Sequence, residues 1–289
     1  MMEEKKSVLI FCEGPHDVAL VSLILKKLLN ASEFSDKFSA LPSPFDKLFQ
    51  TAIENHAKLE LSLDMAHKFF LPDLILTKGD TYIVLFNAGG QNRGDKIKPF
   101  IQNLWDLTLV SDTFPGDATT YIKEHKYIFV SDADFKNHDA TLADISSAFE
   151  TVGGQSWINT SWNKINGTYI AINDKQKNVA ALVWCNTTSG LGTLEDVLME
   201  CLDKDVAYQQ AQGITIEMHD WQMEHPNPQR RIAEIAKMRK ASITLMGQKI
   251  KPGGSMNVIV SQSKLINSGN LQTSPTVNNL VKFFLYFLN

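Results

Sequence analysis

Cysteine is scarce in this sequence, with three in 289 residues, at Cys12, Cys185 and Cys201. The number is odd and no Cys-x-x-Cys pair occurs, which argues against a disulfide framework and against a zinc knuckle. Each cysteine has apolar neighbours in the sequence, as is typical of small buried side chains. The histidines do not have zinc-ligand spacing with any cysteine, and we assign none of them to a metal.

Long apolar segments are also missing. No stretch reaches the ~18 uninterrupted apolar residues that a membrane-spanning helix requires. The first six residues are mostly charged, and the apolar run behind them covers only residues 8–12, which is too short for the core of a signal peptide. Residues 280–288 are apolar but interrupted by Lys282, and they predict a terminal helix packed on the core. We expect a cytoplasmic protein with no membrane partner.

Positive charge is not in excess, because 28 lysine and arginine residues face 32 aspartate and glutamate residues, for a net charge of −4. A nucleic-acid-binding protein of this composition needs a local basic patch or a metal ion. Residues 230–251 form one such patch, since they contain seven cationic residues and one acid. The segment predicts either a helix that contacts phosphates or a solvated helix face.

Short apolar runs alternate with segments of helical periodicity along the chain. Such runs fit strands buried on both faces of a parallel sheet, so the order predicts an α/β fold, mostly parallel and flanked by helices. We expect a core at 1–152 with an insertion at about 31–78, and a β-rich and helical extension at 153–289 that completes the sheet and the site. The main expected strands cover residues 7–12, 81–86, 126–130, 169–172 and 179–184.

Acidic residues follow two of these strands. Glu13 follows the first strand, and Asp132 and Asp134 follow the third. Ligands of α/β sheets bind outside the carboxyl ends of the strands, and neighbouring strands lie ~4.8 Å apart. If these two strands are neighbours, three carboxylates converge, and their repulsion favours a cation such as Mg²⁺ or Mn²⁺, which prefer oxygen ligands. The alternative is that Asp132 and Asp134 are turn or helix-capping residues.

The motif Glu13-Gly14 after the first strand and the motif Asp132-Ala133-Asp134 after a later one resemble the TOPRIM domain of topoisomerases, DnaG-type primases and OLD-type nucleases. The strands before both motifs, and the Gly89-Gly90 pair after the second strand, are also similar to the family. The resemblance covers roughly residues 7–150. It implies a TOPRIM-like, Rossmann-like sheet with a catalytic site for Mg²⁺ or Mn²⁺ at Glu13, Asp132 and Asp134.

Within this family the chain most resembles OLD-type nucleases and small uncharacterised bacterial TOPRIM-like proteins. Their first motif often continues to a further acid, which Asp17 matches, and residues 192–196 resemble a later acidic motif. The resemblance implies that Asp17, Glu195 and Asp196 are additional metal ligands and that Lys240 is catalytic. For Glu195 and Asp196 the alternative is that they are acids favoured by a helix dipole. The sequence has no P-loop, no primase-like zinc segment and no recognisable tyrosine-bearing cleavage domain.

These motifs predict a divalent-metal-dependent nuclease that hydrolyses a phosphodiester of DNA or RNA with metal-activated water. A non-catalytic TOPRIM-like protein that binds nucleic acid or a nucleotide, with or without a partner protein, is the rival prediction. A phosphatase for small phosphate esters is a third interpretation, although that chemistry places an Asp-x-Asp motif after the first strand. Stacking on bases is one role for Trp157, Trp162 and Trp184, but packing in the core is the favoured one.

Overall fold

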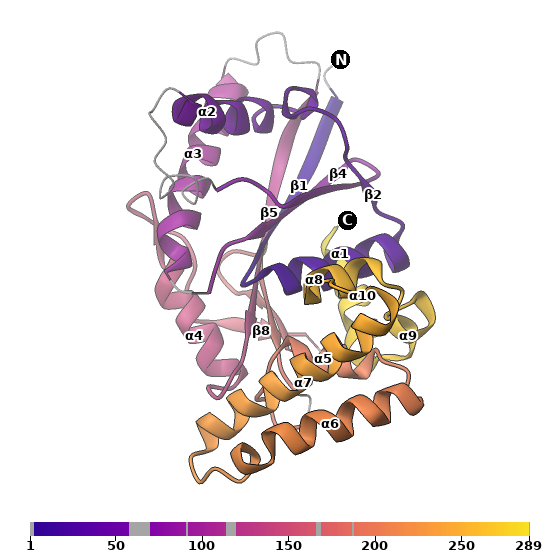
Figure 1. Ribbon diagram of the computed structural model, residues 1–289. Helices are drawn as coiled ribbons and strands as arrows, with labels where there is room; N and C mark the ends of the chain where they lie inside the picture. The colour runs from indigo at the N-terminus through magenta and orange to yellow at the C-terminus, as the bar shows by residue number, and fades with distance from the viewer. Residues whose placement is uncertain are drawn as a thin grey trace.

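Helices cover both faces of an eight-stranded sheet (Figure 1). The computed structural model describes residues 3–57, 70–90, 92–113, 120–165, 169–186 and 188–288. Four parallel strands form the centre of the sheet, and each contains a continuous apolar run where both of its faces are covered. These strands are β1 (Glu3–Cys12), β4 (Thr81–Asn87), β5 (Thr120–Asp132) and β10 (Val179–Trp184).

The central strands lie in the order β4-β1-β5-β10. In the register of the sheet, Leu9 of β1 is paired with Val84 on one side and with Tyr127 on the other. The first and third predicted strands are therefore neighbours, which is the condition for their acidic residues to converge. β10 pairs directly with β5, so residues 153–289 contribute to the centre of the sheet.

On both sides of this centre, each outer strand pairs antiparallel with the strand beside it. Beyond β4 lie β3 (Leu74–Lys78) and β2 (Ser32–Glu33), and beyond β10 lie β9 (Ile170–Asn173) and β8 (Trp162–Lys164). The sheet is thus mixed, and the expectation of a mostly parallel sheet holds for its four central strands. The predicted insertion at 31–78 also supplies β2 and β3 to the sheet.

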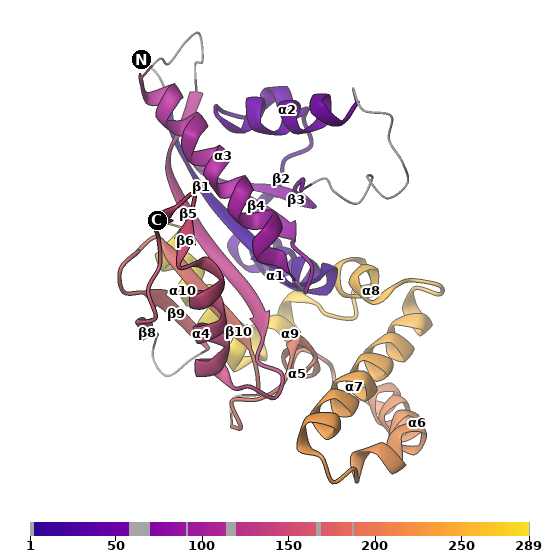
Figure 2. The ribbon, with the colours of Figure 1, turned by 90° about the vertical axis from the view of Figure 1, so that its left-hand side faces the viewer.

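Successive side chains of the central strands point to opposite faces of the sheet, and they form one hydrophobic core on each face. In β1, Val8 and Ile10 belong to one core, and Leu9 and Phe11 belong to the other. The first core is covered by α1 (Pro15–Leu29), α5 (Leu194–Glu200), α8 (Met256–Gln262), α9 (Ser268–Thr273) and α10 (Pro275–Phe287). The second core is covered by α2 (Phe45–Ala57), α3 (Arg93–Thr113) and α4 (His138–Phe149), as Figure 2 shows.

Two further helices form an antiparallel hairpin that projects from one end of the sheet (Figures 1 and 2). α7 (Pro228–Ile250) is the predicted basic helix, and it packs against α5 and α8. The sequence analysis did not predict its partner, α6 (Val206–Met223). The short elements are η1 (Phe38–Ala40), β6 (Thr151–Val152) and β7 (Gln155–Ser156). In the part of the chain that the structure describes, no helix is long and apolar enough to cross a membrane.

Candidate functional site

The carboxyl ends of the four parallel strands meet at one edge of the sheet. Glu13 follows β1 directly, Asp132 is the last residue of β5, and Gly90 lies in the turn after β4. Oε1 of Glu13 lies so close to Gly90 that a Cβ atom there would be 3.3 Å from it. A residue without a side chain therefore leaves the glutamate room beside the neighbouring strand.

Backbone groups hold the two predicted motifs together. The amide of Asp132 donates to Oε2 of Glu13 at 3.2 Å, and the amide of Leu194 donates to Oδ1 of Asp132 at 2.7 Å. Asp134 and Gly192 exchange two backbone hydrogen bonds, of 2.7 and 2.8 Å. Asp134 has a positive φ of 50°, which aspartate tolerates better than most residues. The loops after β1, β5 and β10 therefore meet at one place, as the motifs predict.

An open pocket of about 730 Å³ adjoins these loops and is lined by Glu13, Asp132 and Asp134. The same pocket is lined by three cationic side chains, Arg93, Lys98 and Lys136. Carboxylates that can bind a cation and cations that can bind a phosphate oxygen thus share one cavity.

Arg93 occupies a fixed position in this pocket. Its Nη1 donates to the carbonyl of Val130 at 2.9 Å, and its Nη2 donates to Oγ of Ser131. These bonds tie the start of α3 to the end of β5, and they place the guanidinium near Glu13 and Asp132. Arg93 was not among the residues predicted from the sequence. The one local feature that points to it is its position a few residues after the Gly89-Gly90 turn, at the start of a helix.

Burial disfavours the charged form of the pocket carboxylates. It raises the pKa of Glu13, Asp132 and Asp134, and neighbouring carboxylates raise the pKa of Asp132 further. The guanidinium of Arg93 opposes the rise at Glu13, and the ammonium of Lys136 opposes it at Asp134. A bound cation would favour the ionised form of all three groups.

Asp17 lies close to this cluster but does not line the pocket. It is buried in the first turn of α1, where Oδ2 accepts from the amide of Gly14 at 2.6 Å and Oδ1 accepts from Nε1 of Trp184 at 2.7 Å. Burial raises the pKa of Asp17 to about 7, although both hydrogen bonds oppose the shift. Its oxygens are thus held by protein donors. The prediction that Asp17 is a metal ligand remains untested.

Glu195 and Asp196 also lie outside the lining of the pocket, in the first turn of α5. Oδ2 of Asp196 accepts from the amide of Thr193 at 3.0 Å, which is a helix-capping hydrogen bond, and Oδ1 forms an ion pair with Arg239. Oε1 of Glu195 lies 3.8 Å from Nζ of Lys240. The basic helix α7 therefore directs two of its cations at the acids of α5.

The carboxylates of the pocket match only part of what a divalent ion needs. Within the described residues, no group of three or more His, Cys, Asp or Glu side chains is arranged to hold one ion. Mg²⁺ commonly takes one or two carboxylates and completes its shell with water and substrate phosphate. Glu13 and Asp132, which are linked through a backbone amide, fit that mode of binding, with Asp134 lining the same pocket.

The buried bond between Trp184 and Asp17 gives a stability prediction. Trp184→Phe should lower the free energy of unfolding by about 2 kcal/mol at pH 8, because an ionised buried carboxylate loses its donor. Urea unfolding measures this loss, and the same change in an Asp17→Asn background is the control. An equal loss in both backgrounds would show that packing alone is responsible.

Comparisons with known proteins do not assign this site. No family model and no curated protein matches the chain. Among solved structures, hypothetical protein PH0156 from Pyrococcus horikoshii OT3 is similar, with a TM-score of 0.42 and 15% sequence identity over 99% of this chain and 95% of that chain. This likeness is too distant to support a functional argument.

Proposed function

We propose that this chain is a divalent-metal-dependent enzyme that cleaves phosphodiesters in nucleic acid. The observation that carries the proposal is the shared pocket, in which Glu13, Asp132 and Asp134 face the same cavity as Arg93, Lys98 and Lys136. Acids alone would repel a phosphate, and cations alone would bind it without a place for a metal ion. The combination suits a negatively charged substrate that is bound together with a divalent ion.

Each group has a role that follows from its position. Arg93, which is anchored to the end of β5, and the two lysines of the pocket bind the non-bridging oxygens of the phosphate. Glu13 and Asp132 hold Mg²⁺ or Mn²⁺, which supplies positive charge for the developing phosphorane when it is bound. Asp134 reaches solvent and has a raised pKa, so it accepts a proton from the attacking water.

A second candidate is a binding protein without catalysis. It is favoured by the lack of a three-ligand group among the described residues and by the ion pairs that α7 makes with Glu195 and Asp196. Such a protein would bind nucleic acid or a nucleotide in the same pocket but leave the phosphodiester intact.

A cleavage assay separates the two candidates. The chain is incubated with plasmid DNA, single-stranded DNA and single-stranded RNA in Mg²⁺, in Mn²⁺ or in EDTA, with p-nitrophenyl phosphate as the small-ester control. We expect cleavage of at least one nucleic acid in the presence of metal and none in EDTA, because the carboxylates need the ion to approach a phosphate. Salt-sensitive binding without cleavage would support the binding protein. Neither cleavage nor binding would contradict both.

A further inference from the structure

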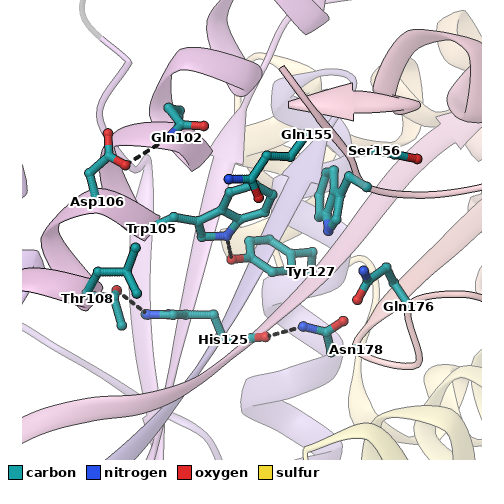
Figure 3. A pocket seen from close by; sticks show the side chains of 12 residues that line it. Gln102, Trp105, Asp106, Thr108, His125, Tyr127, Gln155, Ser156, Gln176 and Asn178 are labelled. Carbon is teal, nitrogen blue, oxygen red and sulfur yellow. Dashed lines mark hydrogen bonds between the residues drawn. The ribbon is translucent and has the colours of Figure 1, made fainter. Parts of the chain in front are cut away.

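A second cavity, of about 420 Å³, lies on the α3 side of the sheet, away from the acidic edge (Figure 3). Tyr127 of β5 lines this cavity and Asp132 lines the first one, and the two residues are five positions, or ~16 Å, apart along the strand. Its lining comes from α3, β5, the β6–β7 hairpin and the turn before β10. The lining includes Trp105, Asp106, Thr108, His125, Tyr127, Trp157 and the amides Gln155, Gln176 and Asn178.

One wall of this cavity is aromatic and fixed. Nε1 of Trp105 donates to the hydroxyl of Tyr127 at 2.7 Å, as Figure 3 shows. The ring of Trp157 packs nearly perpendicular to both, with centroids 5.5 Å from Trp105 and 5.1 Å from Tyr127. Tyr127 and Trp157 are only 2% and 4% exposed, whereas Trp105 is partly exposed, so the ring of Trp105 is the main apolar surface of this wall.

The base of the cavity is uncharged. Oγ1 of Thr108 donates to the carbonyl of Leu104, so it accepts from Nε2 of His125 at 3.0 Å, and Nδ1 of His125 accepts from Oγ of Ser7 at 2.7 Å. Both ring nitrogens are thus bonded in the neutral tautomer. Burial supports the same state, because it lowers the pKa of His125 to about 4.

Amide side chains line the rest of the cavity. Nδ2 of Asn178 donates to the carbonyl of His125 at 2.9 Å, which leaves its Oδ1 available to a ligand. The side-chain amides of Gln155 and Gln176 have no hydrogen-bond partner among the described residues. Amides offer donors and acceptors side by side, which is the pattern that the edge of a nucleobase requires.

We propose that this cavity binds a neutral nucleobase. The lining contains one acid, Asp106, and no lysine or arginine, so it does not favour a phosphate against the wall. A planar base with an apolar face and a polar edge matches the ring of Trp105 together with the amides of the lining. A sugar carries hydroxyls around its whole ring, and the hydroxyls that face the aromatic side chains would have no hydrogen-bond partner. The base belongs either to a free nucleoside or to a nucleic-acid strand, and the proposal does not depend on cleavage at the acidic edge.

Titration of the full chain tests the proposal. Adenosine, guanosine, cytidine and uridine are added separately, and tryptophan fluorescence and calorimetry are recorded, with ribose as the non-base control. We expect saturable binding of at least one nucleoside with a Kd below about 1 mM and quenching of the wall tryptophans. Comparison with a short single-stranded oligonucleotide of the same base then distinguishes the two sources.

Variants locate the binding. Gln176→Ala and Trp105→Leu should each weaken binding of the best nucleoside by about tenfold or more, because one removes an edge contact and the other a stacking surface. Lys177→Ala, at an exposed neighbour outside the cavity, is the matched control and should bind normally. Thermal melting confirms that each variant is folded. The proposal is overturned if no nucleoside binds below about 5 mM, if ribose binds as tightly, or if Gln176→Ala binds normally.

Discussion

Asp132→Asn is expected to reduce metal-dependent cleavage by about 100-fold or more. Asparagine has the same shape, and its Oδ1 can still accept the 2.7 Å hydrogen bond from the amide of Leu194, so the end of β5 keeps its geometry. The substitution removes the negative charge that would hold the ion beside Glu13. The rate of plasmid or oligonucleotide cleavage under saturating Mg²⁺ measures the effect.

The matched control for this variant is Asp139→Asn. Asp139 is an exposed acid of α4 that pairs with Lys164 outside the pocket, so its replacement should leave cleavage within about twofold of the wild type. Calorimetry with Mn²⁺ separates binding from chemistry, since Asp132→Asn should also weaken the binding of the ion. Wild-type rates from a folded Asp132→Asn protein would exclude Asp132 from the reaction.

We expect the free energy of unfolding of Asp17→Asn, taken relative to the wild type, to increase by roughly 3 kcal/mol when the pH is raised from 5 to 8 in EDTA. Burial raises the pKa of Asp17 to about 7 in the folded state, above its value in the unfolded chain. The folded state therefore binds the proton more tightly, and wild-type stability falls as the pH rises from about 4 through 7. Asparagine cannot titrate, so the stability of the Asp17→Asn variant does not fall in this way as the pH rises. Urea unfolding of both proteins across the range measures the difference.

The variant must be compared with the wild type because a buried histidine has the opposite effect on the pH dependence of stability. The pKa of His125 is lowered to about 4, so this residue makes the folded state more stable as the pH rises toward the ordinary histidine value. That contribution is common to both proteins and cancels. Asp174→Asn is the control, since Asp174 is exposed and pairs with Lys177 on the surface. A difference between Asp17→Asn and the wild type that does not change with pH would contradict the buried, protonated state of Asp17.

The central strands could be predicted because their signal is local. Continuous apolar runs of four to six residues occur where both faces of a strand are buried, and all four parallel strands have one. Glu13, Asp132 and Asp134 could be predicted to lie at the same edge of the sheet because each comes one to four residues after such a run. The edge strands were harder to detect, since β2 has two residues and β8 has three, too few to show a period.

The grouping of the acids was not predictable from the sequence. Six acids were assigned to metal, but only Glu13, Asp132 and Asp134 line the pocket. Asp17 and Asp196 accept hydrogen bonds from nearby backbone amides, as residues at helix starts do, and each has a second partner from a remote segment. Arg93 reaches the site through hydrogen bonds to β5, which is distant in sequence, so its position after the Gly89-Gly90 turn does not by itself assign it to the site.

The amino-acid sequence by itself determined the α/β class, the four central strands and the acids that follow them, because buried runs and the residues at their ends are local features. Tertiary structure alone decided which charges meet. Arg93 joins the carboxylates of the pocket, and Arg239 and Lys240 pair with the acids of α5. Such pairings depend on distances between segments tens to hundreds of residues apart, and those distances exist only after the sheet and its helices have packed.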